Sequence, residues 1–189
     1  SEMRMIMLGF RRAGKSSAVN TILSMEAFTS KRTTVCVRRQ GEVNGTHVTI
    51  VDTPGWWKCL SVTDTPEMDK GELLFSTALC PLSPRPHAFL LTLRLDMSFT
   101  AEEKMSVEEH MDLFGGRVWT HTVVLFTHGD CLGDVTVEEF IEGEGEALQW
   151  LIEKCGNRYH VINNENWNDG SQVTNLLDKI ERTVAQNKG

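Results

Sequence analysis

Short apolar runs alternate along the chain with longer stretches that carry apolar residues on one face only. The apolar and β-branched runs predict six strands, at residues 3–8, 33–40, 46–52, 88–95, 122–127 and 159–163. The stretches with one apolar face predict helices at residues 15–23, 101–115, 137–155 and 173–186. Strands that alternate with helices favour a parallel sheet covered on both faces. We therefore expect an α/β fold of three layers, with a mostly parallel six-stranded sheet and helices on both faces.

One pair of strands departs from the parallel pattern. Asn44 and Gly45 lie between the second and third predicted strands, and Asn-Gly is a strong sequence signal for a tight hairpin. These two strands are therefore expected to pair antiparallel. Residues 56–86 show little periodicity and predict a long loop, of a kind that often carries function in a compact domain.

Composition narrows the classes of function. The 189 residues carry a net charge of −7, which argues against nucleic-acid or anionic-lipid binding, because such surfaces need clustered Lys and Arg. Five scattered cysteines without a CxxC pair favour reduced thiols and a cytoplasmic protein. No apolar run approaches the ~20 residues of a membrane helix. We therefore expect no membrane span in this chain, and any membrane attachment would come from segments outside it.

The sequence "GFRRAGKS" follows the first predicted strand and opens the first predicted helix. It fits the phosphate-loop pattern G-x-x-x-x-G-K-[ST], in which backbone N–H groups surround phosphate oxygens. In this pattern Lys15 reaches the β- and γ-phosphates, and the hydroxyl of Ser16 binds Mg²⁺. The residues expected to contact the nucleotide here are Gly9, Arg11, Arg12, Ala13, Gly14, Lys15, Ser16 and Ser17.

A second motif, "VDTPG", ends the strand predicted at residues 46–52. Asp52 stands where an acidic residue holds Mg²⁺ opposite the loop serine. Gly55 can donate its backbone N–H to the γ-phosphate, a contact that hydrolysis removes. The alternative is an ordinary turn, because Pro-Gly is a common turn pair.

A third motif would select the base. Thr127, His128 and Asp130 end the fifth predicted strand and begin the loop after it, where GTPases commonly carry [NT]-K-x-D. The carboxylate of Asp130 can accept hydrogen bonds from guanine N1 and N2, and the ring of His128 can stack on the purine. Asn163 or Asn164, at the end of the last predicted strand, can bond guanine O6. The alternatives are a solvated loop aspartate and the asparagines of an ordinary turn.

With these motifs in place, the chain resembles the GIMAP family, the GTPases of immunity-associated proteins, a septin-like branch of the GTPases. The resemblance covers nearly the whole chain and is carried by "GKSSAVNTIL", "TTVC", "VDTPG", "MDLFG", "VVLFTHGD" and "CGNRYHVINN". Its most specific part is "LSPRPHAFLLTLRLDMSFTAEE", which looks like a box peculiar to this family.

The resemblance implies a Ras-like P-loop GTPase fold, with residues 1–189 as a single GTP-binding domain. It also implies GTP or GDP bound with Mg²⁺, and a homodimer or oligomer in the GTP state. A switch threonine completes the Mg²⁺ ligands in this family. By its spacing to Cys36 this residue is Thr33, with Thr34 as the open alternative.

The chain departs from the enzymatic pattern at two places. Ras-like enzymes often use a glutamine after the DxxG motif to orient water, whereas Trp56 and Trp57 stand here and cannot act as a base. Some family members are thought to contribute an arginine across a dimer from a stretch resembling "GRFT". Ser98 stands at that position, and Arg94 lies earlier, on the predicted strand. Since an arginine finger supplies about 10³–10⁵ in rate, we expect slow GTP hydrolysis, or a GTP-bound scaffold without turnover.

A pair of tryptophans and a short basic cluster each allow two interpretations. The pair Trp56 and Trp57 is either part of the core or an exposed anchor for a partner, since tryptophan is enriched at interface hot spots. A short basic cluster is either a solvated strand edge or a contact for phosphates or a partner subunit; it comprises Lys31, Arg32, Arg38 and Arg39.

Overall fold

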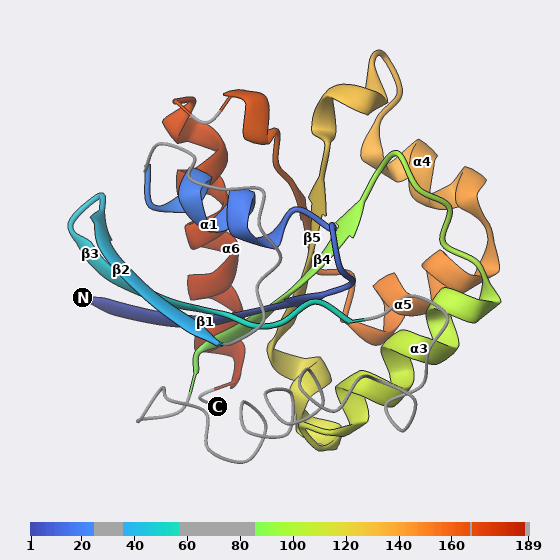
Figure 1. The fold of residues 1–189 in the computed structure, drawn as a ribbon, viewed down its shortest axis with the longest axis horizontal. Helices are drawn as coiled ribbons and strands as arrows, with labels where there is room; N and C mark the ends of the chain where they lie inside the picture. Colours follow the sequence, from blue (N-terminus) through green and yellow to red (C-terminus); the bar gives the residue numbers. More distant parts are fainter. Residues whose placement is uncertain (25–35, 57–85, 167, 188–189) are drawn as a thin grey trace.

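The computed structural model describes residues 1–24, 36–56, 86–166 and 168–187. Six strands form one sheet in the order β2-β3-β1-β4-β5-β6 (Figure 1). The strands are β1 (Glu2–Gly9), β2 (Val37–Val43), β3 (Thr46–Asp52), β4 (Ala88–Arg94), β5 (Thr122–Thr127) and β6 (Tyr159–Val161). Neighbouring strands pair parallel, except β2 and β3, which pair antiparallel.

Helices cover both faces of this sheet (Figure 1). One face carries α1 (Lys15–Ile22) and α6 (Gly170–Asn187). The other carries α3 (Ala101–Asp112), α4 (Val137–Glu144) and α5 (Glu146–Lys154). Three short 3-10 helices lie in the connections, at η1 (Gly116–His121), η2 (Gly129–Leu132) and η3 (Asn164–Asn166). The predicted three-layer α/β architecture is therefore confirmed.

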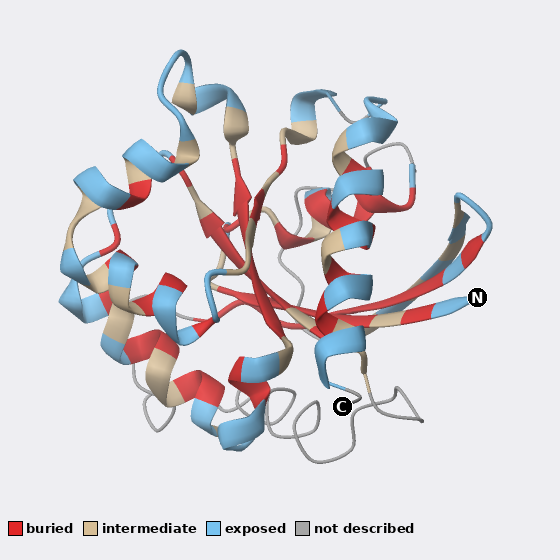
Figure 2. Ribbon diagram, turned by 180° about the vertical axis from the view of Figure 1, so that it is seen from behind, coloured by how far each residue is buried: buried red, intermediate tan, exposed pale blue. Residues whose placement is uncertain are grey.

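Alternate side chains of the central strands enter two separate cores. Ile6 and Leu8 of β1 pack with α3 and α5, whereas Met5 and Met7 pack with α1 and α6. Figure 2 shows the central strands as continuous buried segments between the two helical layers. A strand buried on both faces needs apolar residues at nearly every position, which is why these strands appear in the sequence as unbroken apolar runs.

Local sequence signals form the turns and caps that they predict. Asn44 and Gly45 have φ angles of 50° and 78°, as a tight two-residue hairpin requires, so the predicted antiparallel pair is confirmed. Thr100 and Glu103 form a capping box at the start of α3, in which the backbone N–H of Thr100 donates to the Glu103 carboxylate at 2.8 Å. The chain therefore leaves β4 and enters α3 at a defined residue.

Several element boundaries differ from the prediction, and three of these differences have an identifiable cause. β2 continues to Val43 because it pairs with β3 as far as the hairpin turn, while residues 33–35 lie outside the described part of the chain. The helix predicted at residues 137–155 is two helices, because Gly145 between them has a φ of 114° that interrupts helical hydrogen bonding. β6 ends at Val161, and Asn163 bonds to Gln172 of α6 instead of to a strand.

Two predictions from composition can be compared with the structure. Cys131 and Cys155 are free thiols, and burial raises the pKa of Cys155 to about 12. Cys59 and Cys80 lie outside the described residues. None of the described helices combines the length and the apolar composition that a membrane crossing requires.

Candidate nucleotide-binding site

The loop at residues 10–14 joins β1 to α1 at the carboxyl edge of the sheet, where ligands bind in open α/β sheets (Figure 1). Gly9 has a φ of 146°, and a Cβ at this position would lie 2.6 Å from the carbonyl oxygen of Thr92. Gly14 has a φ of 93° and precedes the first turn of α1. Both glycines of the motif therefore occupy positions where a side chain would strain the backbone. The loop presents its amides and the N-terminus of α1 at one place.

Lys15 lies inside this loop with only 6% of its surface exposed. Its ammonium donates a hydrogen bond to the carbonyl oxygen of Phe10 at 3.1 Å. Burial lowers the pKa of Lys15 to about 8; the charge of Asp52 opposes this shift and that of Arg11 adds to it. A buried ammonium beside loop amides gains much from an anionic ligand, because its own desolvation is already complete.

Ser16 and Asp52 meet beneath the loop. The hydroxyl of Ser16 donates to Oδ2 of Asp52 at 2.6 Å, and Asp52 is 1% exposed at the end of β3. A hydroxyl and a carboxylate are hard oxygen ligands of the kind that Mg²⁺ prefers. The donor set therefore fits the predicted metal. Thr33 and Thr34, the alternatives for the third ligand, lie outside the described residues.

Backbone hydrogen bonds connect the segment after Asp52 to the phosphate loop. Trp56 donates its N–H to Gly9 O at 2.9 Å and accepts from the N–H of Arg11 at 2.8 Å. A Cβ on Gly55 would lie 2.6 Å from Cα of Arg11 and 2.9 Å from Nζ of Lys15. The glycine expected to sense the γ-phosphate therefore lies against the lysine expected to bind it.

The two interpretations of Trp56 are resolved by its burial. Trp56 is 1% exposed and stacks on His110 of α3, with ring centroids 4.5 Å apart. Phe10 of the loop contacts the same indole edge-on at 5.9 Å. Trp56 is thus a core residue, and Trp57 lies outside the described residues.

The loop after β5 is fixed to the phosphate loop. The buried hydroxyl of Thr127 donates to the carbonyl oxygen of Ala13 at 2.7 Å. His128 has a φ of 61°, and its Nδ1 lies 3.0 Å from the Thr127 hydroxyl oxygen. Asp130 is exposed in η2. The bond from Thr127 to Ala13 thus places the start of this loop, which continues through His128 and Asp130, beside the loop expected to hold phosphate.

The two candidate asparagines after β6 have different partners. Asn163 accepts from the N–H of Glu165 at 3.0 Å through its own side chain, forming a local turn. Asn164 accepts from the hydroxyl of Thr21 in α1 at 3.0 Å. The backbone N–H of Gly129 bonds to Ile162 O at 3.2 Å, so the loops after β5 and β6 lie together.

Sequence reasoning missed a contact made by Arg94. Its Nη1 donates to the carbonyl oxygen of Arg12 at 3.1 Å, while Nε and Nη2 bind the carboxylate of Asp96 at 2.7 and 2.6 Å. The hydrogen bonds from Arg94 hold the pKa of Asp96 below its usual range. An arginine and an aspartate two residues apart at a strand end are the signal that could have suggested this pair.

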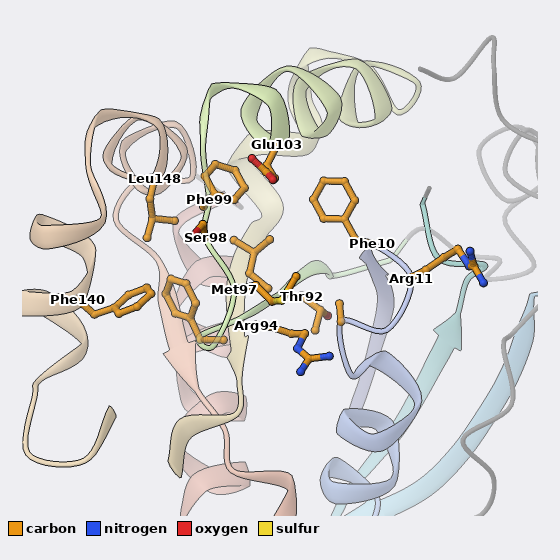
Figure 3. A pocket seen from close by; sticks show the side chains of 13 residues that line it. Phe10, Arg11, Thr92, Arg94, Met97, Ser98, Phe99, Glu103, Phe140 and Leu148 are labelled. Carbon is orange, nitrogen blue, oxygen red and sulfur yellow. The ribbon is translucent and has the colours of Figure 1, made fainter. Parts of the chain in front are cut away.

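A largely apolar pocket lies beside the phosphate loop, between β4, α3 and α5 (Figure 3). Phe10, Phe99, Phe140 and Leu148 line it, and Ser98 contributes to its wall. Ser98, the residue at the position of the family arginine, is exposed in the connection from β4 to α3. The connection therefore presents a hydroxyl at the position where the resemblance places a guanidinium in some family members.

The sequence is similar to that of an established family. The sequence model of the AIG1 family matches residues 3–189. GTPase IMAP family member 8 from Homo sapiens is 30% identical over 190 residues, which cover 99% of this chain and 27% of that protein. Immune-associated nucleotide-binding protein 9 from Arabidopsis thaliana is 30% identical over 198 residues, which cover 98% of this chain and 56% of that protein. The chain therefore spans less than two thirds of the length of either relative.

Solved structures share the fold. Toc33 from Arabidopsis thaliana in complex with GDP and Mg²⁺ matches with a TM-score of 0.75 at 18% identity, over 98% of this chain and 85% of that chain. The G domain of the T. maritima FeoB iron transporter matches with a TM-score of 0.61 at 13% identity, over 97% and 99%. The predicted P-loop GTPase fold is confirmed.

Proposed function

Because the chain belongs to the AIG1 family, we propose that it is a GIMAP-like protein that binds GTP and GDP with Mg²⁺ and hydrolyses GTP slowly. Residues 1–189 act in this proposal as a single GTP-binding domain. The GTP-bound form self-associates, and a non-hydrolysing GTP-bound scaffold is the alternative. Both forms of the proposal use the same nucleotide site.

One observation carries the proposal: a buried ammonium, a hydroxyl–carboxylate pair and a glycine peptide converge on one loop. Lys15 and the amides of the loop bind the phosphates. Ser16 and Asp52 hold Mg²⁺, with Thr33 as the expected third ligand. Mg²⁺ neutralises charge on the β- and γ-phosphates when bound. Gly55, beside Lys15, receives the γ-phosphate.

Guanine is selected on the side of β5. Asp130 accepts from N1 and N2 of guanine, two donors that adenine does not offer together. His128 stacks on the purine face, and Asn163 or Asn164 bonds O6. The bond from Thr127 to Ala13 supports this assignment, because it fixes the spacing between the base loop and the phosphate loop.

Slow hydrolysis follows from what stands near the expected γ-phosphate. Trp56 occupies the position after Gly55 and is packed on His110, so it offers no group that could orient water.

Self-association has support from a structural relative: dimerization is described as important for the GTPase activity of atToc33 and psToc159. That relative matches with a TM-score of 0.71 at 19% identity. A cytoplasmic location is part of the proposal.

The nucleotide that copurifies with the chain tests this function. We expect GDP or GTP, with Mg²⁺, identified by chromatography and mass spectrometry. After loading with γ-labelled GTP, phosphate release over an hour at low and high protein concentration measures turnover. Bound GTP without phosphate release at any concentration would favour the scaffold. Displacement of GDP by ATP as readily as by GTP would rule out guanine selectivity.

A further inference from the structure

The phosphate loop carries two guanidinium groups, and they differ in their surroundings. Arg12 is exposed, and within the described part of the chain its side chain makes no hydrogen bond or ion pair. Arg11 is half-buried, and its backbone N–H donates a hydrogen bond to the carbonyl oxygen of Trp56. Figure 3 shows the Arg11 side chain directed away from the pocket. Arg12 therefore offers a free cation at the surface of the loop.

Arg12 adopts a backbone conformation that its side chain does not favour. Its φ is 63°, in the left-handed region where glycine is the residue without strain. The same conformation could be reached at lower free energy by glycine, which would leave the loop uncharged. A strained non-glycine residue in a ligand-binding loop motivates a functional hypothesis for its side chain.

The backbone around Arg12 is held by neighbours on both sides. Nη1 of Arg94 binds Arg12 O at 3.1 Å, and Asp96 fixes the rest of that guanidinium. The next residue, Ala13, donates its N–H to Phe10 O at 3.1 Å and accepts from the Thr127 hydroxyl at 2.7 Å. The peptide is thus held by hydrogen bonds, whereas the exposed Arg12 side chain makes none with the described residues. Figure 3 shows Arg94 beside the loop that leads from β1 into α1.

We propose that Arg12 is a catalytic residue for GTP hydrolysis and supplies, from the same chain, the cation that is absent at Ser98. This inference rests on the proposed function. In the reaction, a water oxygen bonds to the γ-phosphorus and the bond from that phosphorus to the β–γ bridging oxygen breaks. The electron pair of the broken bond stays on GDP, and both protons of the water leave with the phosphate as H₂PO₄⁻. The Arg12 guanidinium binds the bridging and γ-phosphate oxygens as negative charge grows there.

Two other cations near the loop are already held by hydrogen bonds. Lys15 is buried and already bonded to Phe10 O, so it binds phosphate in ground and transition state alike. The guanidinium of Arg94 is bonded to the Asp96 carboxylate and to the carbonyl oxygen of Arg12. Arg94 is therefore a positioning residue for the loop. The exposed Arg12 side chain can instead make different contacts in the ground state and in the transition state, which is what acceleration requires.

Three variants test the assignment: Arg12→Ala, Arg12→Lys, and Arg117→Ala as a matched control. Arg117 is an exposed arginine in η1, which precedes β5 at the opposite edge of the sheet. For each, we would measure affinity for a fluorescent GDP analogue, the single-turnover rate of GTP hydrolysis, and formation of a GDP–aluminium fluoride complex. The fluoride complex mimics the planar γ-phosphoryl group in the transition state.

We expect Arg12→Ala to slow hydrolysis by about 100-fold or more and to lose the fluoride complex. Its GDP affinity should change by about fivefold or less, because an exposed cation adds little to ground-state binding. Arg12→Lys should restore only part of the rate, since ammonium lacks the planar fork. Arg117→Ala should behave as wild type.

Wild-type hydrolysis by Arg12→Ala would overturn the assignment and leave the proposed function intact. Parallel loss of GDP affinity and rate would also overturn it, since Arg12 would then be a ground-state contact. A wild-type chain that binds GDP but neither releases phosphate nor forms the fluoride complex would overturn hydrolysis and the role of Arg12 together, in favour of the scaffold.

Discussion

The indole of Trp56 lies flat against the imidazole of His110, with ring centroids 4.5 Å apart and 19° between the ring planes. Neither side chain is more than 1% exposed. The backbone of Trp56 forms hydrogen bonds with the backbones of Gly9 and Arg11, which flank Phe10 where the phosphate loop begins. One aromatic pair therefore connects α3 to the nucleotide site.

Removing the imidazole should loosen this connection. His110→Ala leaves a cavity beneath Trp56, and we expect the free energy of unfolding to fall by about 2–4 kcal/mol. GDP affinity should fall as well, because the indole no longer holds the Gly55 segment against the loop. Urea unfolding and GDP titration measure both effects. Met105→Ala, on the same helix at 70% exposure, is the control and should change stability by less than ~0.5 kcal/mol. Equal stability of the two variants would contradict the role of the stack.

Lys15 should destabilise the nucleotide-free fold and be required for GDP binding. Burial lowers the pKa of Lys15 from 10.5 to about 8. At pH 7 the nucleotide-free fold therefore contains a buried charge, which lowers its free energy of unfolding. Lys15→Met should abolish GDP binding and yet raise the free energy of unfolding without nucleotide by about 1–3 kcal/mol at pH 7. Chemical denaturation without nucleotide checks this. As pH rises from 8 to 10.5 the wild type should gain stability relative to the variant, because the unfolded lysine keeps its proton longer. If Lys15→Met were less stable than the wild type, the buried charge of Lys15 would not destabilise the nucleotide-free fold.

Two buried threonines on adjacent strands should respond differently to substitution by valine. Thr127→Val removes the donor to Ala13 O, and we expect a loss of about 1–3 kcal/mol together with weaker GDP binding. Thr92 is also buried, but its hydroxyl has no hydrogen-bond partner in the described residues, so Thr92→Val should be neutral or stabilising. Thermal unfolding of the pair with and without GDP compares them. The same sign for both would contradict the assigned roles.

Gly55 should not tolerate a methyl group. Gly55→Ala brings a carbon to 2.6 Å from Cα of Arg11 and 2.9 Å from Nζ of Lys15, so the loop must shift. We expect at least a tenfold loss of GTP affinity, about 1.4 kcal/mol, by titration with a non-hydrolysable analogue. Gly143→Ala in α4 meets no atom within 4 Å and should leave binding unchanged while adding up to ~1 kcal/mol of helix stability. Full affinity in Gly55→Ala would contradict the proposed contact between this segment and the γ-phosphate.

Buried His160 should make stability depend on pH below neutrality. Burial and the neighbouring Lys179 ammonium lower the pKa of His160 to about 4. The unfolded chain therefore binds the proton first, near pH 6.5, and stability falls as pH drops from 6.5 towards 4. Between pH 7 and pH 5 the wild type should lose about 2 kcal/mol through this group. Burial also lowers the pKa of His110, which adds to the same slope.

Urea unfolding of His160→Gln at pH 7 and pH 5 isolates this contribution. The amide can replace the bonds to Gln172 O and Lys179 without binding a proton, so the variant should show a smaller loss on acidification. His47→Gln, at an exposed position on β3, is the matched substitution. An unchanged slope in His160→Gln would contradict the prediction.

Much of the site could be predicted from sequence because its parts are contiguous. The residues from Gly9 to Ser17 form one loop and one helix start, and the backbone conformations of Gly9 and Gly14 leave few other residue choices. Asp52 ends a strand next to β1, and parallel neighbours bring their carboxyl ends together. The hairpin at Asn44 likewise depends only on local φ preferences.

Contacts between distant residues could not be predicted in this way. The sequence left Trp56 open between core and surface, and His110 had no pattern that linked it to the site. The bond from Arg94 to Arg12 O joins residues 82 apart in the sequence, and the alternation of apolar positions does not encode which strand-end side chain reaches which carbonyl. The break at Gly145 was missed because apolar spacing continues through it.

By itself the sequence determined the order of strands and helices, the phosphate loop and the acidic residue opposite it, since each depends on periodicity or on a short run of residues. Only the tertiary structure decided which polar groups are buried and what each one contacts. Burial and contact depend on packing across the whole sheet. They set the low pKa of Lys15, the stack of Trp56 on His110, and the exposed cation of Arg12.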